Sequence, residues 1–118
     1  MKLWLDDTRE PWKWGRLGFE WAKTADEAIA LLRTGNVVFA DLDHDLAWEH
    51  YPGSGVPESE WTVKCGCVVL LWMKANNVWP VDGVEIHTAN WDQRPKMQAL
   101  VDEHYGGKGE SRRRSAGA

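Results

Sequence analysis

Three aspartates and a histidine come directly after an apolar run, and these residue types can bind a cation or exchange protons. The run at residues 37–40 predicts a buried strand. Because burying an unpaired carboxylate costs several kcal/mol, Asp41, Asp43 and Asp45 are expected to emerge at the carboxyl end of this strand. Strand alternation places these acids on one side and His44 on the other. Ligands bind at this edge of open α/β sheets, so we predict that the stretch forms the floor of a site.

Two other predicted strands are also followed directly by residues that carry chemistry. Asp6 and Asp7 follow the apolar residues 2–5, and His87 opens a polar segment, residues 87–90, after a short strand. The carboxyl ends of parallel strands meet at one edge of a sheet. We therefore expect the three polar segments to form one site, with histidines that can exchange protons near neutral pH.

The hydrophobic periodicity predicts an α/β domain with the order β, β, α, β, α, β, α. Thr24 and Glu27 form a capping box that starts an amphipathic helix, and Gly35 ends it. Residues 47–61 contain proline and glycine, and a loop of this length beside a site is typical of a lid. The strands are expected at residues 2–5, 18–22, 37–40 and 84–86, and the helices at residues 24–35, 63–75 and 92–105.

Length and charge predict one soluble domain with a basic tail. The 118 residues are 43% hydrophobic and 27% charged, which is ordinary for a globular protein. The net charge of −4 combines a body of −7, residues 1–105, with residues 106–118 at +3, which we expect to be a disordered basic tail. The acidic body argues against a nucleic-acid groove. Because no segment is suited to span a membrane and no leader is seen, we expect a cytoplasmic protein.

The two cysteines, Cys65 and Cys67, are separated only by Gly66. Cysteines at this spacing rarely form a disulfide, and no second cysteine pair completes a zinc site. We expect both cysteines to be reduced and structural.

Three motifs stand in order along the chain: Leu5-Asp6-Asp7-Thr8-Arg9, Leu42-Asp43-His44-Asp45-Leu46, and His87-Thr88-Ala89-Asn90 followed by Met97. Together they resemble the cyclic-phosphate processing receiver domains, which are relatives of response-regulator receivers. The resemblance covers roughly residues 2–104. It implies a small flavodoxin- or receiver-like three-layer α/β domain, with about four mostly parallel strands, three helices and an acidic pocket.

The resemblance implies a phosphoesterase whose ligand is a cyclic nucleotide or a cyclic-phosphate end of a nucleic acid. By analogy, Asp6 and Asp7 match the paired acids that hold magnesium in ordinary receivers, and Asp43 matches the acid that accepts phosphate there. Cleaving a cyclic phosphodiester needs neutralised phosphoryl oxygens, a general base and a general acid. The predicted roles are binding of Mg²⁺ or another divalent cation by Asp6, Asp7 and Asp43, catalysis by Asp43, His44 and His87, and ligand binding by Arg9, Thr88, Asn90 and Arg94.

The chain also departs from ordinary receivers. Residues 8–17 look like a loop where a helix is usual, and no lysine stands at a strand end after Asn90. These two departures disfavour phosphorelay signalling through Asp43. The cyclic-phosphate processing family usually has Asn-Pro where this chain has Asn90-Trp91, a difference that bears on the shape of the last loop. The alternative function is a non-catalytic degenerate receiver that binds a phosphorylated ligand or a protein partner. A third is an acidic inhibitor or adaptor of another protein.

Each candidate residue also has a purely structural interpretation. The acids, Asp41 above all, could form caps and salt bridges with Arg9 and Arg94, and His44 and His87 could be satisfied histidines with no ligand. Nine tryptophans need places as well: those on predicted elements are expected in the core, whereas those in loops could stack on a nucleobase or fill a partner interface. The first group is Trp4, Trp21 and Trp72, and the second is Trp12, Trp14, Trp48, Trp61 and Trp91; the ninth, Trp79, is expected at the opposite edge of the sheet.

Overall fold

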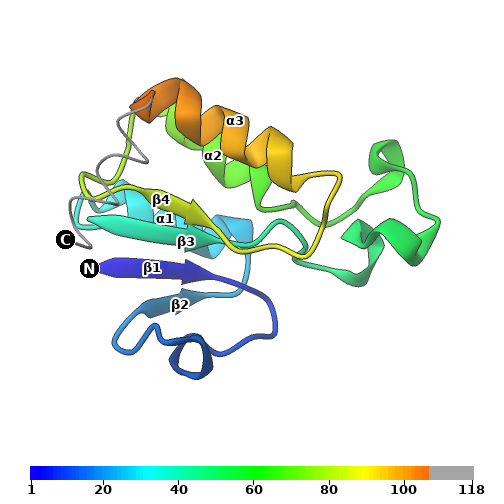
Figure 1. Cartoon of the computed structure of the whole chain (residues 1–118), viewed down its shortest axis with the longest axis horizontal. Helices are drawn as coiled ribbons and strands as arrows, with labels where there is room; N and C mark the ends of the chain where they lie inside the picture. Colours follow the sequence, from blue (N-terminus) through cyan, green and yellow to red (C-terminus); the bar gives the residue numbers. More distant parts are fainter. Residues whose placement is uncertain (107–118) are drawn as a thin grey trace.

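The computed structural model describes residues 1–106, in which four strands form one sheet and three α-helices pack against it (Figure 1). The strands are β1 (Lys2–Leu5), β2 (Glu20–Ala22), β3 (Phe39–Leu42) and β4 (Val84–Ile86). The helices are α1 (Ala25–Arg33), α2 (Cys67–Asn76) and α3 (Arg94–Tyr105). The predicted order of elements and the receiver-like α/β class are confirmed. The predicted tail, residues 106–118, lies outside the described residues apart from Gly106.

All strand pairs are parallel, and the strand order is β2-β1-β3-β4. The hydrogen-bond ladders continue one residue past the strands: the N–H of Asp43 donates to the carbonyl of Leu5 at 3.0 Å, and that of His87 donates to the carbonyl of Leu42 at 2.9 Å. The ends of β1, β3 and β4 therefore lie side by side at one edge. This is the predicted convergence of the three polar segments.

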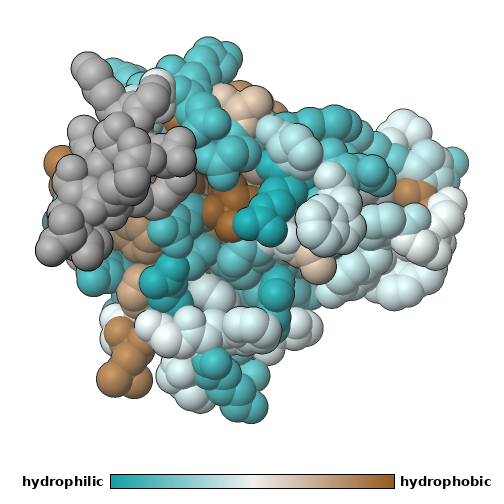
Figure 2. All heavy atoms as spheres, viewed as in Figure 1, coloured by the Kyte–Doolittle hydropathy of each residue, from teal (hydrophilic) through white to brown (hydrophobic). Residues whose placement is uncertain are grey.

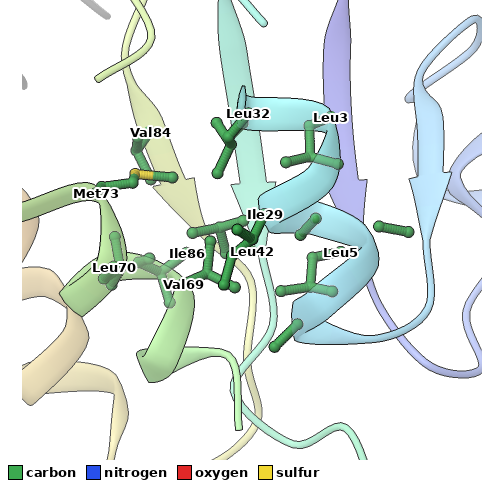
Figure 3. Close-up of a cluster of buried hydrophobic side chains, with 14 of the residues drawn as sticks. Leu3, Leu5, Ile29, Leu32, Leu42, Val69, Leu70, Met73, Val84 and Ile86 are labelled. Carbon is green, nitrogen blue, oxygen red and sulfur yellow. The ribbon is translucent and has the colours of Figure 1, made fainter. Parts of the chain in front are cut away.

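The hydrophobic core lies on one face of the sheet, between the strands and the three helices (Figure 3). Alternate strand residues such as Leu3, Leu42 and Val84 point into it, as strand geometry requires, and each is at most 1% exposed. Thr24 caps α1 as predicted, because its hydroxyl oxygen accepts the N–H of Glu27 at 3.1 Å. None of the helices in the described part of the chain has the length and apolar character that a membrane crossing requires.

Among the described residues, the connection between β1 and β2 covers the opposite face of the sheet, and no α-helix packs there. This connection contains one short 3-10 helix, Pro11–Trp14, followed by Arg16. The guanidinium of Arg16 donates to Asp41 at 2.9 Å and to Glu85 at 2.7 Å, two acids that alternate with the core residues of β3 and β4. The outer layer of the predicted three-layer domain is thus an extended connection held to the sheet by ion pairs.

The predicted long loop, residues 47–61, folds into three short 3-10 helices: Trp48–His50, Pro52–Ser54 and Glu58–Glu60. It protrudes beyond the carboxyl ends of the strands (Figure 1), and the surface seen there is hydrophilic or neutral with few hydrophobic residues (Figure 2). His50 fixes its base, because its Nδ1 accepts the N–H of Leu46 at 2.9 Å and its Nε2 lies 2.7 Å from the carbonyl of Val63. Helix α2 consequently begins at Cys67, later than predicted.

The expectation of reduced cysteines is wrong, because Cys65 and Cys67 are joined in a disulfide. Their Cα atoms are 5.4 Å apart, within the range of disulfides despite the short spacing. The backbone at Gly66 is held by a hydrogen bond from its N–H to the carbonyl of His44 at 2.8 Å. The turn at this glycine brings the two side chains together.

Candidate functional site

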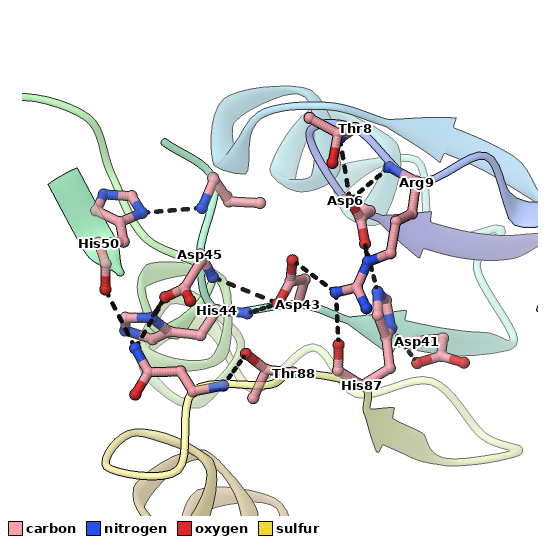
Figure 4. A network of polar contacts seen from close by, with 12 residues as sticks. Asp6, Thr8, Arg9, Asp41, Asp43, His44, Asp45, His50, His87 and Thr88 are labelled. Carbon is pink, nitrogen blue, oxygen red and sulfur yellow. Dashed lines mark hydrogen bonds and ion pairs between the residues drawn. The ribbon is translucent and has the colours of Figure 1, made fainter. Parts of the chain in front are cut away.

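The edge of the sheet where β1, β3 and β4 end carries the three polar segments, and we call it the polar edge. Arg9 lies at its centre and contacts all three strand ends (Figure 4). Its Nε donates to Asp6 Oδ2 at 2.7 Å, and its Nη2 donates to Asp43 Oδ2 at 3.2 Å and to the carbonyl of His87 at 3.3 Å. Asp6 is fully buried and Asp43 nearly so, so both need this compensation. The guanidinium therefore ties β1, β3 and β4 into one site.

Asp6 is held by the turn that follows β1. Its Oδ1 accepts the N–H groups of Thr8 and Arg9 at 3.0 and 2.8 Å, which is the geometry that makes aspartate favourable in turns. Burial acts to raise the pKa of Asp6, but the hydrogen bonds from His87 and from the Arg9 and Thr8 backbone outweigh it and lower the pKa. Asp6 is thus a fixed negative charge that holds both Arg9 and His87.

His87 lies between two carboxylates and stacks on an aromatic ring. Its Nδ1 is 2.5 Å from Asp41 Oδ1, its Nε2 is 3.1 Å from Asp6 Oδ2, and its ring is parallel to that of Trp4 with centroids 3.9 Å apart. Burial would lower the pKa of His87, but the hydrogen bonds to Asp41 and Asp6 prevail and raise it above 6.5. The imidazolium form, which donates from both nitrogens, matches these two acceptors.

The raised pKa of His87 predicts a pH-dependent contribution to stability. A group with a raised folded-state pKa stabilises the fold fully below its ordinary pKa of 6.5 and loses this contribution as pH rises through the folded value. We expect the difference in free energy of unfolding between wild type and His87→Gln to be larger at pH 6 than at pH 9. Urea unfolding at both pH values measures it; equal differences would show that His87 is not held as an imidazolium.

Asp43 is a buried carboxylate with one oxygen used internally and the other facing Arg9. Its Oδ1 accepts the N–H of His44 at 2.8 Å. Burial first and the charge of Asp6 second raise the pKa of Asp43, although Arg9 and His87 act in the other direction. A raised pKa makes this carboxylate a better proton acceptor than an ordinary aspartate.

Two hollows open beside Arg9, and both are lined by Arg9 and Ala89. The first, of about 270 Å³, has two aspartates and one arginine in its lining; it is lined by Thr8, Arg9, Asp43, Asp45, Tyr51 and Ala89. The second, of about 330 Å³, combines cationic and aromatic side chains; it is lined by Trp4, Arg9, Trp14, Ile86, His87, Thr88, Ala89 and Arg94. The second, which we name the cationic hollow, has the chemistry to take a phosphate next to a flat ring.

A model of the cyclic-phosphate processing receiver domain family matches residues 1–103 of the chain. The chain belongs to this family. No curated protein and no solved structure matches it. The match spans all four strands and nearly all of α3, so the polar edge described above lies within the family's domain.

This receiver domain does not bring all the predicted site residues to Arg9. The His44 side chain is fully buried, and its ring lies 5.6 Å from that of Trp61 and 5.9 Å from that of His50. Asn90 is buried too: its amide nitrogen donates to Asp45 Oδ1 at 2.9 Å, and its amide oxygen accepts the N–H groups of residues 92 and 93. His44 thus lies apart from the cationic hollow, and the contacts of Asn90 organise the loop before α3.

The other predicted ligand-binding residues lie where a ligand could meet them. Arg94, at the start of α3, lines the cationic hollow with Arg9. Thr88 lines it as well, and its hydroxyl oxygen accepts the N–H of Asn90 at 3.2 Å. The ligand-binding roles predicted for Arg9, Thr88 and Arg94 remain predictions with suitable geometry.

Two residues that contact His87 at the polar edge were not predicted as site residues. Asp41, expected to be structural, accepts from His87, and Trp4, expected in the core, stacks on the same ring. Trp4 and Asp41 are paired in the β1–β3 register. Strand alternation could have found them, because Leu3 and Leu5 face the core and the residue between them must face the other side.

The atoms around Arg9 fit a divalent cation in type. Oδ1 of Asp7 is buried and has no hydrogen-bond partner among residues 1–106, and burial followed by the charge of Asp6 raises the pKa of this carboxyl. One ligand atom each of Asp6, Asp43 and His87 also lies within 4.8 Å of the other two. Carboxylate oxygens are the donors that Mg²⁺ prefers. Such a cation would share Asp6 and Asp43 with the guanidinium of Arg9.

Proposed function

We propose that this receiver domain hydrolyses a cyclic phosphodiester bound in the cationic hollow. The observation that carries the proposal is the position of Arg9, which contacts the buried carboxylates of Asp6 and Asp43 and the backbone of His87. A phosphoryl group at this guanidinium would lie next to a proton donor, a proton acceptor and a second arginine, Arg94. These are the groups that phosphodiester cleavage needs.

The ligand that suits the hollow is a cyclic nucleotide or the cyclic-phosphate end of a nucleic acid. Arginine guanidinium groups bind phosphate oxygens through paired N–H donors, and Arg9 and Arg94 line the same hollow. Trp14 lines it as well and is 58% exposed, and the guanidinium carbon of Arg9 lies 5.5 Å from the centroid of its ring. A nucleobase could stack on this indole while the phosphate meets the arginines.

In the proposed reaction, a water oxygen attacks phosphorus and one phosphorus–oxygen bond of the ring breaks. Asp43, whose pKa burial raises, takes the proton of the attacking water. His87, whose pKa Asp41 and Asp6 raise, donates a proton to the leaving ribose oxygen. The product is a phosphomonoester with a free hydroxyl group. A divalent cation held by Asp6, Asp7 and Asp43 would further neutralise the phosphoryl oxygens.

A second candidate is a non-catalytic domain that binds the same ligand class. It is favoured by one observation: both ring nitrogens of His87 already face carboxylates, at 2.5 and 3.1 Å. A histidine held in this way could serve only as a fixed positive charge. The two candidates agree on the ligand and differ in turnover.

Turnover of a panel of cyclic phosphates decides between these functions. The panel contains 2′,3′- and 3′,5′-cyclic nucleotides and oligonucleotides ending in a cyclic phosphate, each tested with Mg²⁺, with Mn²⁺ and with a chelator. The hydrolase proposal expects a linear phosphomonoester from at least one substrate. Binding by calorimetry without any product would support the non-catalytic binding domain. If the protein neither binds nor cleaves any member of the panel, both candidate functions are wrong.

Arg9→Gln supplies the matched test of the phosphate site. We expect this variant to lower kcat/KM by about 100-fold or more, because it removes a preorganised charged donor. The control is Arg33→Gln at the end of α1, whose side chain lies over Trp72 and not at the polar edge. Equal activity of both variants would show that Arg9 does not contact the phosphate.

A further inference from the structure

A second polar cluster lies beside the polar edge. It is formed by His44 and the two cysteines. One ligand atom each of His44, Cys65 and Cys67 lies within 4.8 Å of the other two. His44 is fully buried, Cys65 is 4% exposed, and Cys67, at the first turn of α2, is half-buried. Two sulfurs and an imidazole are ligands that zinc prefers.

The free nitrogen of His44 is the observation that points to a ligand. Its Nδ1 is 2.7 Å from Asp45 Oδ1, a carboxylate that accepts hydrogen bonds, so this nitrogen carries the hydrogen. Its Nε2 is buried and has no hydrogen-bond partner within residues 1–106. Neighbouring His50 is different, because both of its nitrogens have partners at 2.9 and 2.7 Å. A carboxylate that orients a histidine in this way is the usual second partner of a metal-binding imidazole.

The backbone holds the cysteines against His44. Gly66 donates its N–H to the carbonyl of His44 at 2.8 Å. The two segments approach so closely that an ideal Cβ at position 66 would lie 1.7 Å from the carbonyl oxygen of Asp43. The positions of Cys65 and Cys67 relative to His44 are therefore fixed by main-chain packing.

We propose that reduction of the Cys65–Cys67 disulfide opens a zinc site formed by the two thiolates and His44 Nε2. A dithiol reductant supplies two electrons and two protons; the sulfur–sulfur bond breaks, two thiols form, and the dithiol becomes a disulfide. Zn²⁺ then displaces the two thiol protons and binds three protein ligands. The fourth, tetrahedral position is taken by water, which can reach the half-buried Cys67 side.

Distance and charge select Zn²⁺ as the occupant. Zinc–sulfur bonds of about 2.3 Å and zinc–nitrogen bonds of about 2.0 Å put tetrahedral ligand atoms roughly 3.5–3.8 Å apart, so the cluster needs only small side-chain shifts. Two thiolates and Zn²⁺ are neutral together, whereas Cu⁺ would leave a net negative charge buried beside Asp45. The neutral complex is the one this buried position favours.

Zinc titration of reduced and oxidised protein tests the site. The full chain is reduced with dithiothreitol, freed of it without oxygen, and titrated with Zn²⁺ in competition with a chromophoric chelator. We expect the reduced protein to bind one equivalent more Zn²⁺ than the oxidised protein, in which, of the described residues, only the acids around Arg9 could hold a cation. Cys67→Ser, at the more accessible cysteine, should lower the affinity by about 100-fold or more. Equal affinity of the reduced and oxidised forms would overturn the proposal.

Loading the wild-type protein with Co²⁺ gives a test of the cysteine ligands that does not depend on how well a variant folds. The wild-type reduced protein loaded with Co²⁺ should show thiolate-to-cobalt charge-transfer absorption and the visible bands of tetrahedral Co²⁺. His44→Gln should change these bands, whereas His104→Gln on α3, a histidine stacked on Trp79, should not. Absence of the charge-transfer absorption in wild type would show that the cysteines do not bind the metal.

Asp45 is a positioning residue in this proposal. Asp45→Asn keeps an oxygen that can accept from His44 Nδ1 but removes the negative charge that strengthens the imidazole as a ligand. We expect zinc affinity to fall by about 10-fold, with the Co²⁺ spectrum unchanged. A purely structural role for Asp45 predicts no change in affinity once the variant is folded.

Discussion

Replacing His87 with glutamine is expected to lower kcat for cyclic phosphate hydrolysis by about 100- to 10,000-fold, the usual contribution of a general acid. Glutamine can still hydrogen bond to Asp41 or Asp6, but it has no proton that titrates near neutral pH. Because Arg9 and Arg94 remain, KM should change much less than kcat. Initial rates at saturating substrate measure the effect.

His104→Gln is the matched control for this variant. His104 lies on α3 and stacks on Trp79 with ring centroids 4.2 Å apart, away from the polar edge. We expect its activity to equal that of wild type. The pH profile adds a second readout: a general acid with a raised pKa should lose activity only as pH rises through that raised value. An unchanged kcat in His87→Gln would remove His87 from the mechanism.

The convergence of the three polar segments was predictable because parallel strands impose it. Asp6, Asp43 and His87 each come directly after a strand, and β1, β3 and β4 are neighbours in the sheet. No knowledge of side-chain packing is needed for this inference, since strand polarity alone brings the carboxyl ends together.

The orientation of side chains past the strand ends was less predictable. The alternation of β4 continues through His87, whose N–H extends the ladder to Leu42, and this places its ring on the same face as Asp41. The alternation of β3 does not continue through residues 44–45, because the chain turns there and buries His44. Where a strand stops is decided by tertiary contacts, which the local sequence does not contain.

The Cys65–Cys67 disulfide is a second feature that the local sequence could not predict. Their spacing in sequence argued against pairing, but the contact of Gly66 with the His44 backbone, 22 positions away along the chain, sets the path of the chain between them. This long-range contact also brings His44 to the cysteines. The pairing of the two cysteines was thus decided by packing between the end of β3 and the start of α2, and not by their spacing in the sequence.

Gly66→Ala should be among the most destabilising single-methyl changes in the chain. Its Cβ would lie 1.7 Å from the carbonyl oxygen and 2.8 Å from the carbonyl carbon of Asp43, so one of two backbone segments has to move. We expect the free energy of unfolding to fall by about 3 kcal/mol or more, as measured by urea unfolding. Gly53→Ala is the control, because an added Cβ there meets nothing within 4 Å.

The same change should also weaken the site, because the displaced segment contains Asp43. Its Oδ2 lies 3.2 Å from Arg9, a distance that a backbone shift of a fraction of an ångström would alter. Under conditions where Gly66→Ala remains folded, its ligand affinity should therefore fall below that of Gly53→Ala. If the two variants unfold at the same urea concentration and bind alike, then the close approach of Gly66 to Asp43 does not position the site.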